Sequence, residues 1–110
     1  MSSVFELLEE IRKRPAMYVG GEDSHRVTQL RSLEHLLNGY SLALHHHGIR
    51  EPVADFNREF GAFLSRTRGW SASAGPVAAI REAAKSDADA WELFWTLVDE
   101  FRDACEARSR

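Results

Sequence analysis

The fold is decided by the stretch VTQLRSLEHLLNGYSLALHH, residues 27 to 46. Its apolar residues recur every three or four positions, at Leu30, Leu33, Leu37, Tyr40 and Leu44. This spacing predicts a helix that buries one stripe, and Gly48 is placed to end it in a left-handed conformation. Gly39 inside the helix costs about 1 kcal/mol relative to alanine, which favours a close crossing by another helix, with a slight kink as the alternative.

The preceding segment predicts a shorter helix from about Ser3 to Lys13. Ser3 and Glu6 have the spacing of a capping box, and apolar residues then follow at helical period until Pro15. Residues 14 to 24 contain a proline and two glycines, which predicts an ordered loop from Arg14 to Ser24. The loop has three apolar residues that could tuck beneath it: Met17, Tyr18 and Val19.

Three further segments complete the chain. Pro52 can serve as the first residue of a helix with an apolar stripe at Phe56, Phe60, Phe63 and Leu64, which Gly69 closes. Pro76 starts a short alanine-rich helix to about Lys85, with Val77, Ile80 and Ala84 inward. Ser86 and Asp89 form a capping pair for a last helix of about five turns, with a stripe at Trp91, Phe94, Val98, Phe101 and Cys105.

No strand-length alternation of apolar and polar residues is present. The prediction is therefore an all-α fold, a compact irregular bundle of about five helices in a single domain over residues 1–110. Because five helices joined by short loops do not share one axis comfortably, we expect the second and last predicted helices at the centre.

Composition narrows the functional classes. The formal net charge is -3 and the isoelectric point is about 5.9, which argues against sequence-independent binding of nucleic acid. A single cysteine excludes an intramolecular disulfide and favours a reducing compartment, for which the cytoplasm is the prediction. Acidic residues near the N-terminus do not fit an export signal. The sequence contains no run of about 18 apolar residues, so no membrane span is predicted.

No set of residues predicts catalysis, a cofactor or a metal site. Consecutive histidines at positions 45 to 47 point about 100° apart on a helix and do not converge on one ion. Cys105 lies on the predicted buried stripe, whereas a catalytic thiol needs an exposed electropositive setting. The chain is therefore predicted not to be an enzyme. An alternative is a small enzyme that uses Arg12 to Arg14 and a histidine on an anionic substrate.

Candidate binding residues lie on the surface elements. The basic run Arg12, Lys13, Arg14 could bind a phosphate or a carboxylate, or could simply complement a helix C-terminus while hydrated. Tyr18 and Trp70 are loop aromatics, which serve either as interface anchors or as lids on a core. Acidic residues of the last helix form either a solvated outer face or a docking surface for a basic partner.

One local stretch resembles the start of the DNA gyrase B ATPase domain. The string IRKRPAMYVG, residues 11 to 20, and the following LEHLL, residues 33 to 37, carry the likeness over about a quarter of the chain. That family places a water-activating glutamate and a magnesium-binding asparagine on the next helix, in an acidic pattern. Residues 36 to 44, LLNGYSLAL, contain no acid, and the chain is too short for the nucleotide-covering sheet. ATP hydrolysis is not expected.

A second resemblance spans nearly the whole chain. Small bacterial proteins similar to the immunity partners of secreted polymorphic toxins share four features: the string from Arg12 to Gly20, Gly39-Tyr40, a phenylalanine-rich helix at residues 56–64, and LFWTLVDEF at residues 93–101. The chain departs from that pattern at residues 70–75. The resemblance implies a stoichiometric inhibitor that occludes a cognate toxin.

On this hypothesis Arg14, Tyr18 and Trp70 are predicted anchors, and Asp99 and Asp103 could steer a basic toxin. The alternative function is a regulatory adaptor that binds gyrase or another nucleotide-dependent enzyme through the gyrase-like string.

Overall fold

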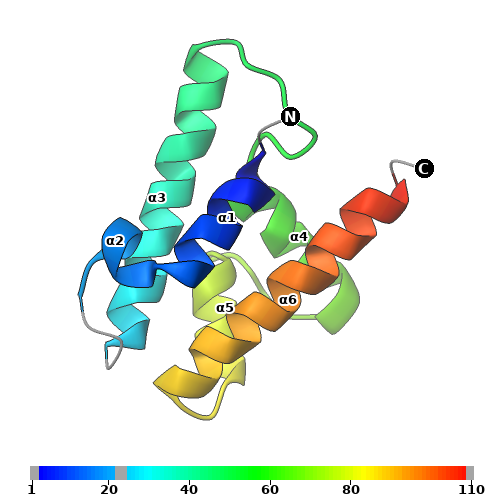
Figure 1. Ribbon diagram of the computed structural model, residues 1–110. Coiled ribbons are helices and arrows are strands. Elements are labelled where there is room, and N and C mark those ends of the chain that lie inside the picture. Colours follow the sequence, from blue (N-terminus) through cyan, green and yellow to red (C-terminus); the bar gives the residue numbers. More distant parts are fainter. Residues whose placement is uncertain (1–2, 22–24, 109–110) are drawn as a thin grey trace.

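The computed structural model describes residues 3–21 and 25–108, and within them the chain forms α-helices and no strand. The helices are α1 (Val4–Lys13), α2 (Pro15–Val19), α3 (Arg26–His46), α4 (Phe56–Arg68), α5 (Pro76–Ala83) and α6 (Asp87–Arg108) (Figure 1). The predicted all-α bundle is confirmed, with one short helix, α2, in addition to the five that the spacing predicts.

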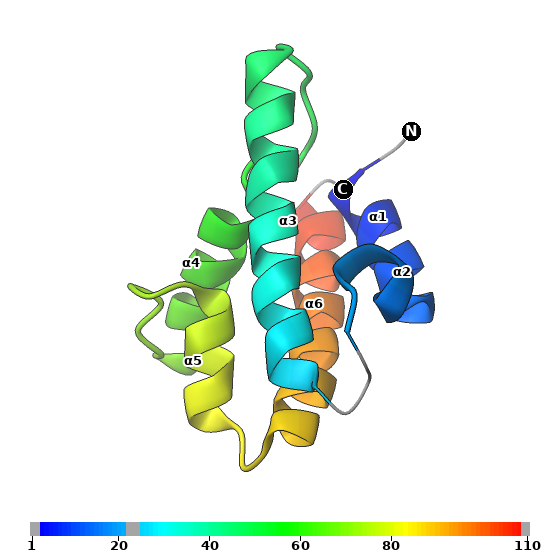
Figure 2. The ribbon, with the colours of Figure 1, turned by 90° about the vertical axis from the view of Figure 1, so that its left-hand side faces the viewer.

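The two longest helices, α3 and α6, form the centre of the bundle, as predicted. Seen along one side, α1 and α2 lie against one flank of this pair, and α4 and α5 lie against the other (Figure 2). The predicted apolar stripes meet in one core, in which Leu33, Phe60 and Leu97 are fully buried. The helices therefore pack around a single apolar core.

Phenylalanine rings dominate that core. The Phe56 and Phe60 rings stack with centroids 5.1 Å apart, and Phe101 of α6 lies 5.5 Å from Phe60 and 5.3 Å from Phe63. Aromatic pairs at these separations are stabilising beyond the area they bury. The phenylalanine stripe of α4 is thus the surface that joins α4 to α6.

The predicted loop after the first helix and the predicted start of α4 are wrong, and one predicted helix end differs by two residues. Residues 15–19 form α2 rather than a loop, because proline at a first helical position needs no hydrogen-bond partner for its nitrogen. Helix α4 begins at Phe56 rather than Pro52, because the Asp55 carboxylate accepts the Arg58 amide at 3.4 Å. Helix α5 ends at Ala83, two residues before the predicted Lys85. Ser24, the predicted loop end, lies outside the described residues.

Three of the predicted helix termini are confirmed and two other local predictions are not. Gly48 and Gly69 take φ angles of 65° and 72°, and the Ser86 hydroxyl accepts the Asp89 amide at 3.1 Å. In contrast, Ser3 makes no side-chain cap hydrogen bond. No atom outside α3 lies within 4 Å of a Cβ placed on Gly39, so the expected close helix crossing is wrong.

The N-terminus of α1 is capped from far along the chain. Glu51, in the segment between α3 and α4, accepts the Val4 amide at 3.2 Å with one carboxylate oxygen. Its other oxygen accepts the hydroxyl of Tyr40, which belongs to α3. One carboxylate therefore joins α1, α3 and the segment between α3 and α4.

This contact gives Tyr40 an unusual titration. Burial, the hydrogen bond to Glu51 and the negative charges of Glu51 and Glu6 all raise the pKa of Tyr40 above its ordinary value of 10.0. Between the two pKa values the folded state keeps a proton that the unfolded chain has lost, so stability falls as pH rises above about 10. Urea unfolding on both sides of that pH should show the fall in the native protein and much less of it in Tyr40→Phe. Tyr18→Phe is the control, and an undiminished fall in Tyr40→Phe would contradict the assignment.

Candidate functional site

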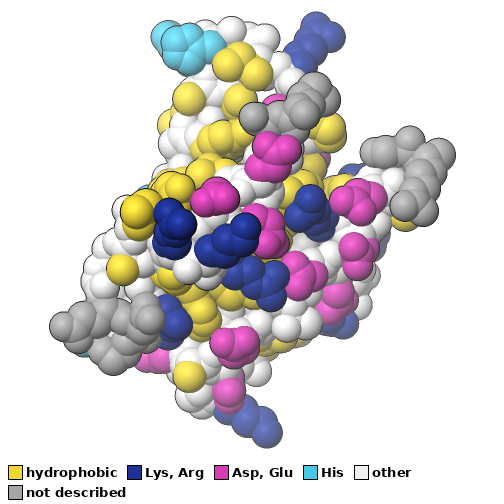
Figure 3. Space-filling model, in the orientation of Figure 1, with side chains coloured by type: hydrophobic (Ala, Val, Ile, Leu, Met, Phe, Trp, Pro, Cys, Tyr) yellow, Lys and Arg dark blue, Asp and Glu magenta, His cyan; other side chains and the backbone are white. Residues whose placement is uncertain are grey.

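Helix α2 presents apolar side chains to solvent. Met17 is 69% exposed and Tyr18 is 37% exposed, and none of the five residues of α2 is buried. Met17 and Tyr18 therefore do not tuck beneath the chain, whereas Val19 is half-buried against the core. Figure 3 shows hydrophobic side chains gathered over α2 and the upper part of α3. The exposed apolar surface of α2 is not explained by packing of the core.

A buried amide holds α2 in place. Gln29 of α3 has a relative exposure of 0%, and its side-chain nitrogen donates to the Gly20 carbonyl oxygen at 3.1 Å. Its side-chain oxygen accepts a hydrogen bond of 2.7 Å from Arg26, whose guanidinium lies 4.2 Å from the centre of the Trp91 ring. Since a buried amide without partners would be costly, these bonds fix the C-terminal end of α2 against α3.

Sequence reasoning missed Gln29, although a signal was present. Gln29 lies four residues before Leu33 and eight before Leu37, so it occupies the buried stripe of α3. A polar residue on such a stripe needs a hydrogen-bond partner in the fold. The partner, a carbonyl group nine residues earlier, depends on how α2 folds back on α3.

Arg14 stands at the junction of α1 and α2. Its backbone amide donates to the Glu10 carbonyl and its own carbonyl accepts the Met17 amide, both at 3.1 Å. The side chain is exposed and forms no ion pair with another described residue. Arg14 and Tyr18, two of the predicted partner-binding residues, therefore lie at the two ends of one short exposed segment.

The neighbouring Arg12 is used within the fold. Its guanidinium contacts both carboxylate oxygens of Asp99 at 3.0 and 3.1 Å and lies 5.5 Å from the centre of the Trp95 ring. Arg12 of the basic run is therefore paired with a carboxylate of the protein itself. Asp99 forms an ion pair with Arg12, whereas Asp103 is exposed and makes no ion pair with another described residue.

Trp70 lies apart from the other predicted anchors. It follows Gly69 at the end of α4, is half-buried against the core, and its carbonyl accepts the Ser65 hydroxyl at 2.7 Å. The α4–α5 connection is on the flank of the bundle opposite α2 (Figure 2). The structure thus brings Arg14 and Tyr18 together, places Asp99 beside α1, and separates Trp70 from them.

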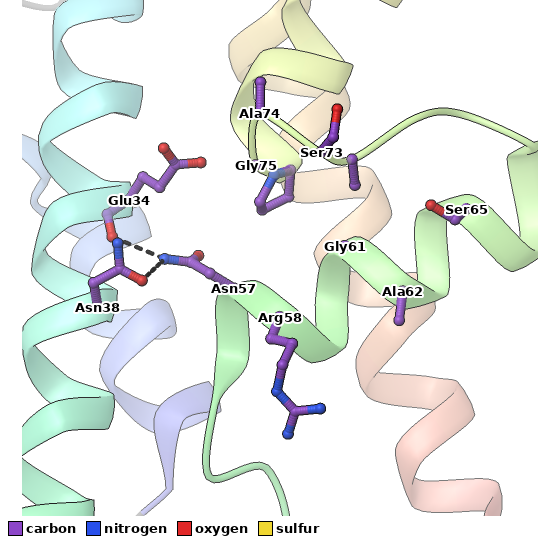
Figure 4. A pocket seen from close by; sticks show the side chains of 12 residues that line it. Glu34, Asn38, Asn57, Arg58, Gly61, Ala62, Ser65, Ser73, Ala74 and Gly75 are labelled. Carbon is purple, nitrogen blue, oxygen red and sulfur yellow. Dashed lines mark hydrogen bonds between the residues drawn. The ribbon is translucent and has the colours of Figure 1, made fainter.

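A polar depression opens between α3, α4 and the α4–α5 connection (Figure 4). It has a volume of about 550 Å³ and is lined by Glu34, Asn38, Asn57, Ser65, Ser73 and Gly75 among others. The Asn57 amide nitrogen donates to the Glu34 carbonyl at 2.9 Å and to the Asn38 side chain at 2.8 Å. These bonds join α3 to α4.

The carboxylate in this depression also has a structural role. One Glu34 oxygen accepts the Val77 amide at 3.2 Å, at the N-terminus of α5, where a negative charge is favourable. The oxygen is therefore engaged in capping a helix. The Arg58 side chain, on the depression's rim, is directed away from the α4–α5 connection (Figure 4).

The remaining candidates for chemistry lie apart. The three consecutive histidines are exposed at the end of α3, and no cluster of three or more metal-binding side chains occurs among the described residues. Cys105 is half-buried rather than fully buried, and it borders a depression lined also by Val4 and Arg102. Within residues 3–21 and 25–108, no helix is long and apolar enough to cross a bilayer.

No protein-family model matches this chain, and no curated protein or solved structure matches it either.

Proposed function

We propose that this chain is a bacterial immunity protein, which neutralises a cognate toxin by covering its catalytic cleft or another surface that the toxin requires. The contact is made by the α2 surface, which we define as the exposed side chains of Arg14, Met17 and Tyr18. The proposed mechanism is steric occlusion at one-to-one stoichiometry and needs no cofactor.

The observation that supports this proposal is the exposure of Met17 and Tyr18 on a helix in which no residue is fully buried. Exposed apolar side chains that project from a fixed element have the properties of an interface that lacks its partner. Tyrosine, methionine and arginine are also the residues enriched at the centres of protein interfaces. The α2 surface combines all three within five residues.

Charge supports a basic partner. The chain has a formal net charge of -3, and Asp103 keeps an exposed carboxylate on the outer side of α6. Such groups accelerate association with a basic partner without forming the contact itself. Figure 3 shows acidic and basic side chains intermixed over α1 and α6 on the face that includes α2. Recognition through α2 is therefore expected to depend mainly on shape and apolar contact.

The test is rescue of growth in cells that express the toxin encoded beside this chain, with affinity measured for the purified pair. Met17→Asp and Tyr18→Ala should each weaken binding at least tenfold, which corresponds to about 1.4 kcal/mol. Arg81→Asp, an exposed site on α5, is the control and should protect as well as the native protein. Unchanged binding in both α2 variants would reject the α2 surface.

The immunity function would be rejected if this protein co-purified with gyrase or another nucleotide-dependent enzyme and no toxin were encoded beside it. That result would favour the regulatory adaptor that the gyrase-like string suggests.

A further inference from the structure

The end of α3 projects beyond the rest of the bundle as an arm. The arm consists of residues 41–46 of α3 and the returning segment 47–54, and it stands clear of the other helices (Figures 1 and 2). Leu44 is buried, and its carbonyl accepts the Ile49 amide of the returning segment at 2.9 Å. Because Glu51 near the middle of this segment is hydrogen-bonded to Tyr40 and Val4, the arm is a defined structure.

A groove runs between the arm and the start of α4. It has a volume of about 820 Å³, and its lining includes Leu42, Leu44, His45, Ile49, Arg50 and Arg58. Leu42 is 69% exposed and Ile49 is 53% exposed, so two of the four exposed large hydrophobic residues of the described chain border this groove. Two of the lining residues, Asp55 and Arg58, belong to the start of α4, which lies on one side of α3, whereas α2 lies on the other side (Figure 2).

The charge of this groove is opposite to that of the chain. Arg50 is exposed and forms no ion pair with another described residue, and the Arg58 side chain is 75% exposed. Asp55 is the one acidic residue in the lining, and its carboxylate contacts the Arg58 side chain at 3.2 Å and caps α4.

Two nearby acids, Glu51 and Glu59, are not part of the lining and accept hydrogen bonds within the fold. Glu51 accepts hydrogen bonds from Tyr40 and Val4, and Glu59 accepts the Asp55 amide at 3.1 Å. The lining therefore combines apolar side chains with two arginines and one acid, of which Arg50 is unpaired among the described residues, on a protein whose formal net charge is -3.

We propose that this arm groove binds an acidic amphipathic helix of a partner protein, which packs leucine-like side chains against Leu42 and Ile49 and directs carboxylates toward Arg50 and Arg58. An amphipathic helix in an apolar groove is a common mode of recognition, and guanidinium groups pair with carboxylates through two parallel hydrogen bonds. A second copy of the chain fits less well, because a symmetric pairing of two arms would bring like charges together. This surface is separate from α2, so the inference does not depend on the proposed immunity function.

The test uses the full-length protein labelled with ¹⁵N and a synthetic amphipathic helical peptide of leucine, alanine and glutamate. We expect amide shifts confined to the groove, an affinity at least tenfold higher than for a matched peptide with lysine in place of glutamate, and weakening by salt. Equal binding of the two peptides, or shifts that lie elsewhere, would overturn the proposal.

Two variants and a control make the test specific. Leu42→Glu should abolish binding, and Arg50→Glu should reverse the preference toward the lysine peptide; neither side chain is buried, and circular dichroism checks that the fold is intact. Arg31→Glu, on the same face of α3 about three turns earlier, should bind as the native protein does. Concentration-dependent self-association in sedimentation without peptide binding would assign the groove to a second copy and overturn the proposal, as would binding to phosphatidylserine vesicles alone.

Discussion

Replacement of Phe60 by alanine is expected to lower the free energy of unfolding by about 3–5 kcal/mol. Phe60 is fully buried, and its ring contacts those of Phe56, Phe94 and Phe101 at centroid distances of 5.1, 5.9 and 5.5 Å. Truncation removes contacts to both α4 and α6 and leaves a cavity that the surrounding rings fill only in part. Since domains of this size are stable by about 5–15 kcal/mol, the loss is a large fraction of the total.

Equilibrium unfolding in urea, followed by circular dichroism, measures this effect. Phe5→Ala is the matched control, because Phe5 is only partly buried, at the edge of the same ring cluster. Its truncation should cost clearly less. If the two variants lost equal stability, the ring cluster would not be centred on Phe60.

Gly75→Ala is expected to destabilise the protein by about 2–4 kcal/mol. Gly75 precedes α5 with a φ of 97°, a conformation that strains any residue with a Cβ. A Cβ at this position would also lie 2.7 Å from a carboxylate oxygen of Glu34, the residue that caps α5 through the Val77 amide. The Glu34 side chain must therefore move away, and the Val77 amide at the start of α5 then loses its hydrogen-bond acceptor.

A double-mutant cycle with Glu34→Ala separates the backbone strain at Gly75 from the steric conflict with Glu34. In that background the strain at φ remains and the steric conflict is gone, so Gly75→Ala should cost measurably less than in the native protein. Gly39→Ala is the opposite control: the site is helical and open, and the substitution should raise stability by about 0.5–1 kcal/mol. A stabilising effect of Gly75→Ala would show that this contact is absent in solution.

The long helices were predictable because their sequence patterns are local. Leu30, Leu33 and Leu37 lie one helical turn apart, and the burial of one stripe follows from that spacing alone. The left-handed glycines at the ends of α3 and α4 are equally local, since a φ near +70° favours glycine whatever the rest of the chain does.

The errors arise where distant residues decide the local structure. The α1 cap is supplied by Glu51 rather than Ser3, and α2 is held by Gln29, so neither can be read from a short window. The start of α4 did carry a local signal. Asp55 accepts the Arg58 amide while Glu59 accepts the Asp55 amide, and this reciprocal pair outweighs the tendency of Pro52 to open a helix.

In the candidate site, too, some features follow from local sequence and others depend on distant residues. Tyr18 was suggested as an aromatic residue in a predicted loop, and the structure shows it exposed on the short helix α2. The pairing of Asp99 with Arg12 depends on α1 and α6 lying side by side, 87 residues apart in sequence, and no spacing rule predicts it. The arm groove is also a tertiary feature, because its lining comes from α3, the returning segment and α4.

The fixed attachment of α2 has a kinetic consequence. A recognition element that is already ordered loses little conformational entropy on association, so the encounter step needs no folding of the contact residues. Substitutions on such an element act mainly on how long a complex survives, and much less on how often it forms. Under the proposed function, the buried Gln29 would therefore contribute to the lifetime of the complex indirectly, by holding α2 in place through its hydrogen bond to Gly20.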